Sequence, residues 1–306
     1  MKLIGENIHI ISKSVREALI NRDELFVTKL VESQKNMDYI DLNVGPAKGP
    51  LENIFPWLCN IVEKNTDLKI SFDTTNAEEM KRGLSVTKNS GMAFINSTSV
   101  DEPRFSAMTD LALNYDCNLI ALTMSKETGI PKAADGRLEI AMEIYENALN
   151  QGINNDKLYF DPLILPLNVD QGQCVEALNT IRMIKESFDP PVKTIVGLSN
   201  VSNGAPNELR PLINRVFAVL AFGAGLDAAI IDAKDTELVR ILKMLINGTP
   251  QQDIDNLYLD LSQIYKNFGE LEDVKFDENS ATQQNVIKTA SVLLNKKIYS
   301  HSFTQI

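Results

Sequence analysis

The feature that most constrains the fold is a repeat of eight short apolar runs, each ending in polar residues, which alternate with longer segments of helical pattern. The runs are Leu3–Ile8, Tyr39–Asn43, Lys69–Asp73, Ala93–Asn96, Leu119–Thr123, Leu158–Asp161, Thr194–Ser199 and Ala228–Asp232. They are rich in Ile, Leu and Val, which is typical of parallel strands buried on both faces. Eight such strands separated by helices predict an α/β fold, a (β/α)8 TIM barrel.

The main alternative is an open, doubly wound sheet, which needs a glycine-rich phosphate turn after its first strand. This chain has the stretch Glu6–His9 at that place, and its 306 residues contain neither GxGxxG nor GxxxxGK[ST]. The barrel is therefore favoured.

Helix start signals fit the same order of elements. Ser14 and Glu17 have capping-box spacing before an apolar periodicity that reaches Val31, which predicts a helix there. A further helix is predicted over 207–222, with Pro211 in its first turn.

An acidic segment near the C-terminus interrupts this order. Residues 247–282 contain eight acids against Lys266 and Lys275, a net charge of -6 out of -11 for the chain. The apolar spacing from Leu257 to Phe268 is helical. We therefore expect residues 1–306 to form a single barrel domain, with 247–282 as an acidic helical insertion before the last helix, Asn285–Leu294. An acidic surface without a role is the simpler interpretation of that segment.

Composition narrows the class of protein. A net charge of -11 argues against a nucleic-acid binder or a protein of anionic membranes, since both need a basic surface. The three cysteines lie far apart, and no apolar run approaches the ~18 residues of a spanning helix. The N-terminus lacks the apolar core of a signal peptide. We expect a cytoplasmic protein.

Polar residues follow nearly every predicted strand, and in a barrel the active site lies at these carboxyl ends. They are Glu6, Asp41, Asn43, Asp73, Asn96, Asp161, Ser199, Asn200 and Asp232. The set predicts a mouth of carboxylates and carboxamides without cations or thiolates.

The missing residue types restrict the chemistry of this mouth. Only two histidines exist, His9 and His301, which disfavours Ser-His-Asp or Cys-His catalysis. A hard-cation site on Asp41, Asp73, Asp161 and Asp232 stays open. So does a neutral, donor-rich heterocycle, because a 2-amino-4-oxo-pyrimidine edge donates N–H groups that a carboxylate accepts two at a time.

Seven segments in order carry a family resemblance. They are Gly5–Asn7, Asp41–Pro46, Phe72–Asn76, Ile95–Thr98, Asp161–Pro166, Gly197–Ser202 and Arg210–Arg215. Together they resemble the pterin-binding barrel family. Within it the chain is most similar to methyltetrahydrofolate:corrinoid protein methyltransferases, including the corrinoid/iron–sulfur protein methyltransferase and the second methyltransferase of O-demethylase systems. The likeness covers about residues 3–245 and resumes near 283–303.

The resemblance implies a folate site and assigns roles to its residues. Asp73, Asn96 and Asp161 would hydrogen-bond the pterin ring, and Asn200, as the catalytic residue, would lie beside its N5. The same pocket would be lined by Asp41, Asn43, Gly197, Ser199 and Arg210, with no metal.

The implied reaction is methyl transfer between N5 of methyltetrahydrofolate or tetrahydrofolate and the cobalt of a corrinoid. N5 must gain a proton or a strong hydrogen bond as the N–CH₃ bond breaks. Asn200 cannot release a proton at neutral pH, so we expect it to orient a protonated N5 while water delivers the proton. No Asp-x-His-x-x-Gly stretch for binding cobalamin occurs, which implies that a corrinoid protein is the partner. The resemblance also implies a homodimer.

Three other functions remain open at this point. Dihydropteroate synthases of the same family hold a diphosphate with a Ser-Arg-Lys motif after the seventh strand and an Arg-x-His pair after the eighth. This chain has Ser199-Asn200-Val201 and Ile230-Ile231-Asp232 there, so that charge is missing. A non-catalytic folate-binding barrel and a magnesium-dependent lyase are the others. The sequence leaves open the direction of transfer and the pathway, acetyl-CoA formation or O-demethylation.

Overall fold

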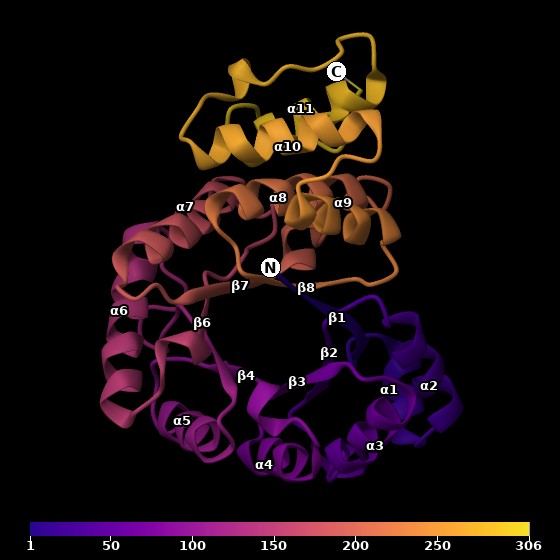
Figure 1. Cartoon of the computed structure of the whole chain (residues 1–306), viewed down its shortest axis with the longest axis vertical. Helices are drawn as coiled ribbons and strands as arrows, with labels where there is room; N and C mark the ends of the chain where they lie inside the picture. The colour runs from indigo at the N-terminus through magenta and orange to yellow at the C-terminus, as the bar shows by residue number, and fades with distance from the viewer. Residues whose placement is uncertain (306) are drawn as a thin grey trace.

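The computed structural model describes residues 1–305, and its centre is a closed barrel of eight parallel strands in chain order (Figure 1). The strands are β1 (Lys2–His9), β2 (Tyr39–Gly45), β3 (Lys69–Thr74), β4 (Phe94–Thr98), β5 (Asn118–Leu122), β6 (Leu158–Asp161), β7 (Lys193–Gly197) and β8 (Ala228–Ile231). β1 pairs with β8 from Lys2 opposite Ala228 to Gly5 opposite Ile231, which closes the ring. The predicted (β/α)8 barrel is confirmed.

Helices surround the barrel and alternate with its strands (Figure 1). They are α1 (Lys13–Ile20), α2 (Glu24–Ser33), α3 (Phe55–Asn65), α4 (Ala77–Val86), α5 (Arg104–Tyr115), α6 (Ala134–Gln151), α7 (Gly172–Ser187), α8 (Arg210–Ala224), α9 (Thr236–Asn247), α10 (Asp253–Lys266) and α11 (Ala281–Leu293).

Three helix predictions differ from the structure. The last helix, predicted over Asn285–Leu294, begins four residues earlier as α11 (Ala281–Leu293), because Ser280 caps it by accepting from Gln283 N. The periodic stretch up to Val31 forms two helices, because the chain turns at residues 21–23 and Asp23 caps α2 by accepting from Phe26 N at 3.0 Å. Ser14 is therefore not a cap, since it lies inside α1, whose N-cap is Ser12. α8 begins at Arg210 rather than 207, with Pro211 in its first turn as expected.

The interior of the barrel is filled by apolar side chains. Ile4, Tyr39, Phe94, Ile120, Tyr159, Ile195 and Ala228 form this plug. Phe94 makes edge-to-face contacts with Tyr39 and Tyr159, at ring-centroid distances of 4.9 and 4.8 Å. Each such pair adds about 0.5–1.5 kcal/mol beyond the burial of its area. This packed apolar layer lies directly beneath the polar side chains of the barrel mouth.

The helix α8 is buried on nearly every side. Its buried residues include Ile213, Val216–Ala221, Gly223 and Ala224, and an all-round apolar helix requires partners on all faces. The barrel covers its inner side, and α10 and α11 pack on it from outside. Figure 1 shows α10 and α11 as an outer layer beyond α8 and α9. α10 is the helix expected within the acidic segment.

No helix within residues 1–305 has the length and apolar content needed to cross a membrane.

Candidate active site

The mouth of the barrel is a polar layer directly above the apolar plug. Side chains alternate along a strand, so the residue two positions beyond each plug residue faces the same interior. Two positions beyond Ile4, Tyr39, Phe94 and Tyr159 stand Glu6, Asp41, Asn96 and Asp161. On successive inward-facing positions the side chains change from apolar to polar. This change marks this end of the barrel as the candidate site.

Neighbouring strands hold the polar layer together through hydrogen bonds. Asp41 is 3% exposed and accepts from Ser71 Oγ at 2.6 Å and from Asn96 Nδ2 at 3.3 Å. Asn43 Nδ2 donates to Asp73 Oδ2 at 2.5 Å. These two sets of hydrogen bonds join the end of β2 to the ends of β3 and β4, and the register of β3 and β4 places Asp73 opposite Asn96.

Asp161 stands on β6, apart from that network. Its Oδ1 accepts from the backbone N of Leu163 at 2.8 Å, and its other oxygen accepts no hydrogen bond from residues 1–305. The half-buried carboxylate thus keeps an acceptor for a ligand. This is the chemistry that a pterin N–H edge requires.

The residues after β7 lie in a 3-10 turn, Leu198–Ser202, directly after Gly197. Ser199 Oγ donates to Glu6 Oε2 at 3.2 Å, which joins this turn to β1. Asn200 is exposed, and its Oδ1 accepts from Asn203 Nδ2 at 3.3 Å. Arg210 Nε donates to Ser202 Oγ at 3.3 Å. Asn200 is held only loosely, so its amide is free to face a ligand.

Arg210 is not the only cation near the mouth, and the expectation of a mouth without cations is wrong. Arg104, at the start of α5, donates to the backbone oxygens of Thr74, Thr75 and Ser97. Through these hydrogen bonds Arg104 ties the end of β4 to the residues that end β3.

Arg137 on α6 is a second arginine that the sequence patterns missed. It is fully buried, donates to Pro131 O at 2.9 Å and to Gln173 Oε1 at 2.5 Å, and so ties the loop after β5 to α7. Its Nη1 is buried without a partner among residues 1–305. The sequence gives no signal for either arginine, because each acts from inside a helix and belongs to no strand-end motif.

The carboxyl groups of the mouth hold their protons unusually strongly. Burial raises the pKa of Asp161 to about 7, against the Leu163 N–H and the charge of Arg137, which lower it. Burial also raises the pKa of Asp41 to about 6, although Ser71 and Asn96 stabilise its ionised form.

Asp73 and Glu6 follow the same rule. Burial and the charge of Asp41 raise the pKa of Asp73 well above its usual range, while Asn43 and Arg104 oppose the rise. Burial raises the pKa of Glu6 to about 7. Several raised carboxyl pKa values in one cleft are typical of functional sites.

Asp232 has a structural role at the rim. Its Oδ1 accepts from Asn7 Nδ2 at 2.6 Å and from Lys234 N at 2.9 Å, so it fixes the turn after β8. Within residues 1–305 no three His, Cys, Asp or Glu side chains gather as a group that could hold a metal ion.

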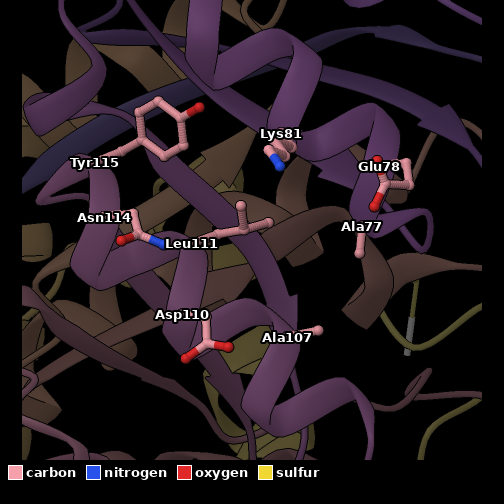
Figure 2. A pocket seen from close by; sticks show the side chains of 8 residues that line it. All are labelled: Ala77, Glu78, Lys81, Ala107, Asp110, Leu111, Asn114 and Tyr115. Carbon is pink, nitrogen blue, oxygen red and sulfur yellow. The ribbon is translucent and has the colours of Figure 1, made fainter.

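A groove also lies outside the barrel, between α4 and α5 (Figure 2). Its lining residues are Ala77, Glu78, Lys81, Ala107, Asp110, Leu111, Asn114 and Tyr115. They come from the two helices and not from the strand ends, so this groove is not part of the mouth.

Comparison with known proteins defines the class that this fold and mouth represent. The family described as pterin binding enzyme matches residues 42–232, more than half of the chain and nearly the whole set of strand ends described above. The protein belongs to the pterin-binding enzyme family.

Two curated proteins and one solved structure show what the chain is similar to. The chain is 24% identical over 243 residues to a methylcorrinoid:tetrahydrofolate methyltransferase of Eubacterium limosum, which covers 78% of this chain and 88% of the relative. It is 28% identical over 262 residues to methionine synthase of Mycobacterium tuberculosis, covering 82% of this chain but only 21% of that protein. Among solved structures, a dihydropteroate synthase of Xanthomonas albilineans superposes with a TM-score of 0.60 at 16% identity, covering 81% and 94% of the two chains, which is a likeness of fold alone.

Proposed function

We propose that the protein is a methyltransferase that moves a methyl group between N5 of methyltetrahydrofolate or tetrahydrofolate and the cobalt of a corrinoid held by a separate protein. The observation that carries the proposal is the polar layer itself, with Asp73, Asn96 and Asp161 at three strand ends of a family barrel. The likeness to a methylcorrinoid:tetrahydrofolate methyltransferase over most of both chains supports the same reaction.

The pterin would lie on the plug with its polar edge toward the acidic layer. Asp161 would accept N–H groups of the ring with its open oxygen, and Asp73 and Asn96, fixed by Asn43 and Asp41, would complete the edge. A carboxylate that accepts from a ligand N–H forms a charge-assisted bond, which is the strong kind. Gly197, Ser199 and Arg210 would form the opposite wall.

Asn200 would act where the methyl group leaves. Its carboxamide can accept a hydrogen bond from a protonated N5 and so hold the leaving nitrogen in position. The exposed setting of Asn200 at the rim also leaves room for an acceptor as large as a corrinoid protein to approach. The homodimer implied by the resemblance and the cytoplasmic location expected from the composition belong to the same proposal.

The chemistry of the mouth argues against dihydropteroate synthase. That reaction expels a diphosphate, which needs unpaired cations close to the leaving group. The position after Ser199 is an asparagine rather than an arginine.

Anaerobic mixing with methyltetrahydrofolate and cob(I)alamin tests the proposal. We expect the cob(I)alamin spectrum to convert to that of methylcobalamin, at a rate that saturates with folate and is unchanged by EDTA. Folate binding without conversion would indicate a non-catalytic binding barrel. Loss of activity with EDTA would indicate the magnesium enzyme, and formation of dihydropteroate from p-aminobenzoate and the pterin diphosphate would indicate the synthase.

A further inference from the structure

The proposed reaction needs a proton at N5, and Asn200 has none to give. An acid for this purpose must stand in the mouth, near the turn that carries Asn200, and must hold a proton at neutral pH. The following inference rests on the proposed function and concerns the source of that proton.

Glu6 meets the positional requirement. It is linked through its Oε2 to Ser199 Oγ at 3.2 Å, and Ser199 is the chain neighbour of Asn200. The strand β1 places Glu6 two residues above Ile4 of the plug, so its carboxyl group stands in the barrel mouth. Asp41 stands on β2, the strand that pairs with β1, and its charge acts on Glu6.

The charged groups around Glu6 differ from those around the predicted pterin-edge acids. Asp73 and Asp161 each have an arginine nearby that favours their ionised form, Arg104 and Arg137. Glu6 has Arg210 of α8 in the same role but faces two carboxylates, Asp232 after β8 and Asp41 on β2, whereas Asp73 faces Asp41.

The hydrogen-bond partner of Glu6 sets it apart from these acids, because Ser199 belongs to the turn that carries Asn200. Burial raises the pKa of Glu6 to about 7; the Ser199 hydroxyl and the charge of Arg210 oppose the rise, and the charges of Asp232 and Asp41 add to it. An acid with a pKa near the working pH is the most effective proton donor.

We propose that Glu6 is the acid that supplies the proton to the methyl-bearing nitrogen of the folate. During transfer the C–N bond breaks and its electron pair goes to N5, while the bond from the methyl carbon to the acceptor forms with the electron pair of the acceptor cobalt. The proton leaves the Glu6 carboxyl group and ends on N5. Glu6 remains as a carboxylate, beside Ser199, and regains a proton from water.

The isosteric variant Glu6→Gln tests the assignment, because its amide oxygen can still accept from Ser199. At saturating methyltetrahydrofolate we expect wild-type kcat for transfer to cob(I)alamin to fall as pH rises through about 7, since the acid must be protonated. In Glu6→Gln we expect kcat to drop by about 10²-fold and the pH-dependent fall to disappear. Folate affinity by calorimetry should change little, and Glu78→Gln, in the groove outside the barrel, serves as the matched control.

The outcomes separate this inference from the proposed function. If wild-type protein neither binds folate nor forms methylcobalamin, the proposed function fails. If wild-type protein transfers methyl and Glu6→Gln keeps both its rate and its pH profile, only the role of Glu6 is refuted. Should Glu6→Gln not fold, ¹³C-carboxyl NMR of wild-type protein decides instead: we expect a glutamate that titrates near pH 7 and responds to folate, and its absence overturns the inference.

Discussion

At the scale of single residues, the mouth is distinguished by buried carboxyl groups that do not each have a cation paired with them. Asp41 receives two hydrogen bonds, whereas Asp161 receives one and keeps an open oxygen. Burying a carboxylate is costly unless it is hydrogen-bonded or paired, so burial raises the pKa of both acids. A ligand rich in N–H groups therefore completes this site electrostatically.

Replacing Asp161 with Asn tests its role as acceptor. The amide oxygen can still accept from Leu163 N, so the turn should be kept while the charge is lost. We expect methyltetrahydrofolate binding, measured by calorimetry, to weaken by about 1.5–3 kcal/mol, as for a hydrogen bond to a charged group. Asp73→Asn should act in the same direction, and Asp110→Asn in the outer groove should leave the affinity unchanged.

The raised pKa of Asp161 also predicts how folate affinity changes with pH. With a pKa of about 7 in the free protein, Asp161 is mainly protonated at pH 6 and mainly ionised at pH 8. If the ligand needs the carboxylate, its affinity rises with pH through this range and binding at pH 6 releases a proton. Calorimetry in two buffers of different ionisation enthalpy measures that release, and an equal release from Asp161→Asn would contradict the assignment.

Asn200 is expected to act on the rate rather than on binding. Its side chain is exposed and makes one hydrogen bond, to Asn203, so removing it should not disturb the fold. We expect Asn200→Ala to lower kcat for methyl transfer far more than it weakens folate binding. Equal losses in both quantities would mean that Asn200 serves only to bind folate.

At the scale of elements, α8 determines how the outer layer joins the barrel. A methyl group built on Gly223 would lie 2.5 Å from the backbone oxygen of Ser262 on α10, so the two helices meet at a distance that only glycine allows. The part of α8 around Gly223 therefore packs against the barrel on one side and against α10 on the other.

The variant Gly223→Ala tests this contact. The added methyl group meets backbone that cannot move without shifting α10, so we expect the free energy of unfolding to fall by about 1–3 kcal/mol. Gly172→Ala on α7 is the control, because its nearest neighbour, Asp170 Oδ1, is 3.5 Å from the added atom. Denaturant unfolding should show the control unchanged or up to about 1 kcal/mol more stable.

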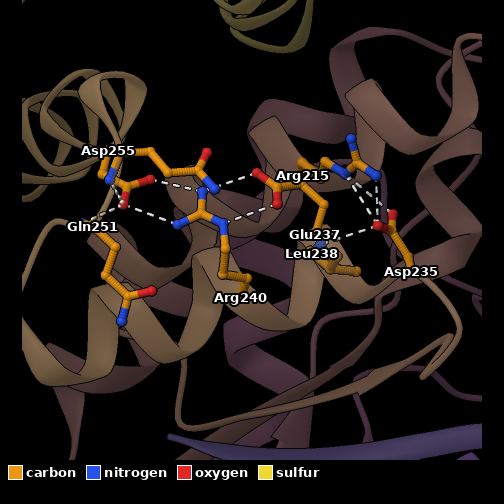
Figure 3. Close-up of polar contacts among 8 residues, drawn as sticks. Arg215, Asp235, Glu237, Leu238, Arg240, Gln251 and Asp255 are labelled. Carbon is orange, nitrogen blue, oxygen red and sulfur yellow. Dashed lines mark hydrogen bonds and ion pairs between the residues drawn. The ribbon is translucent and has the colours of Figure 1, made fainter.

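At the scale of the whole molecule, the acidic C-terminal segment is attached to the barrel by ion pairs as well as by apolar packing. Figure 3 shows Arg240 of α9 between Glu237 and Asp255, and Arg215 of α8 paired with Asp235. The Asp255 side chain is fully buried on α10, and Arg240 reaches its two oxygens at 2.7 and 2.9 Å. Much of the negative charge of the segment lies elsewhere, on its exposed surface.

We therefore expect Arg240→Met to lower the stability of the protein without changing its folate binding. The change leaves a buried carboxylate unpaired, which costs about 3 kcal/mol. We expect a lower Tm in thermal unfolding, with unchanged folate binding below the transition, because Arg240 is on α9 and its guanidinium is directed at Asp255 of the outer layer rather than at the mouth. A loss of folate affinity in folded Arg240→Met would link the outer layer to the site and would count against 247–282 as an insertion without a role in binding.

The sequence by itself determined the strands, their number and the polar residue at each strand end, because burial on both faces forces an apolar run whose ends can be read directly. Asp73, Asn96 and Asp161 could be found in this way, and their roles as ligands stay predictions. It could not find Arg104 or Arg137, since a charge inside a helix is indistinguishable from a surface charge until the helix is packed. Nor could it find the raised pKa of Glu6, which arises first from burial of its carboxyl group in the closed ring and then from the charges of Asp232 and Asp41, which lie 226 and 35 residues away in the chain. Closure of the barrel, which is a tertiary event, sets the protonation of its mouth.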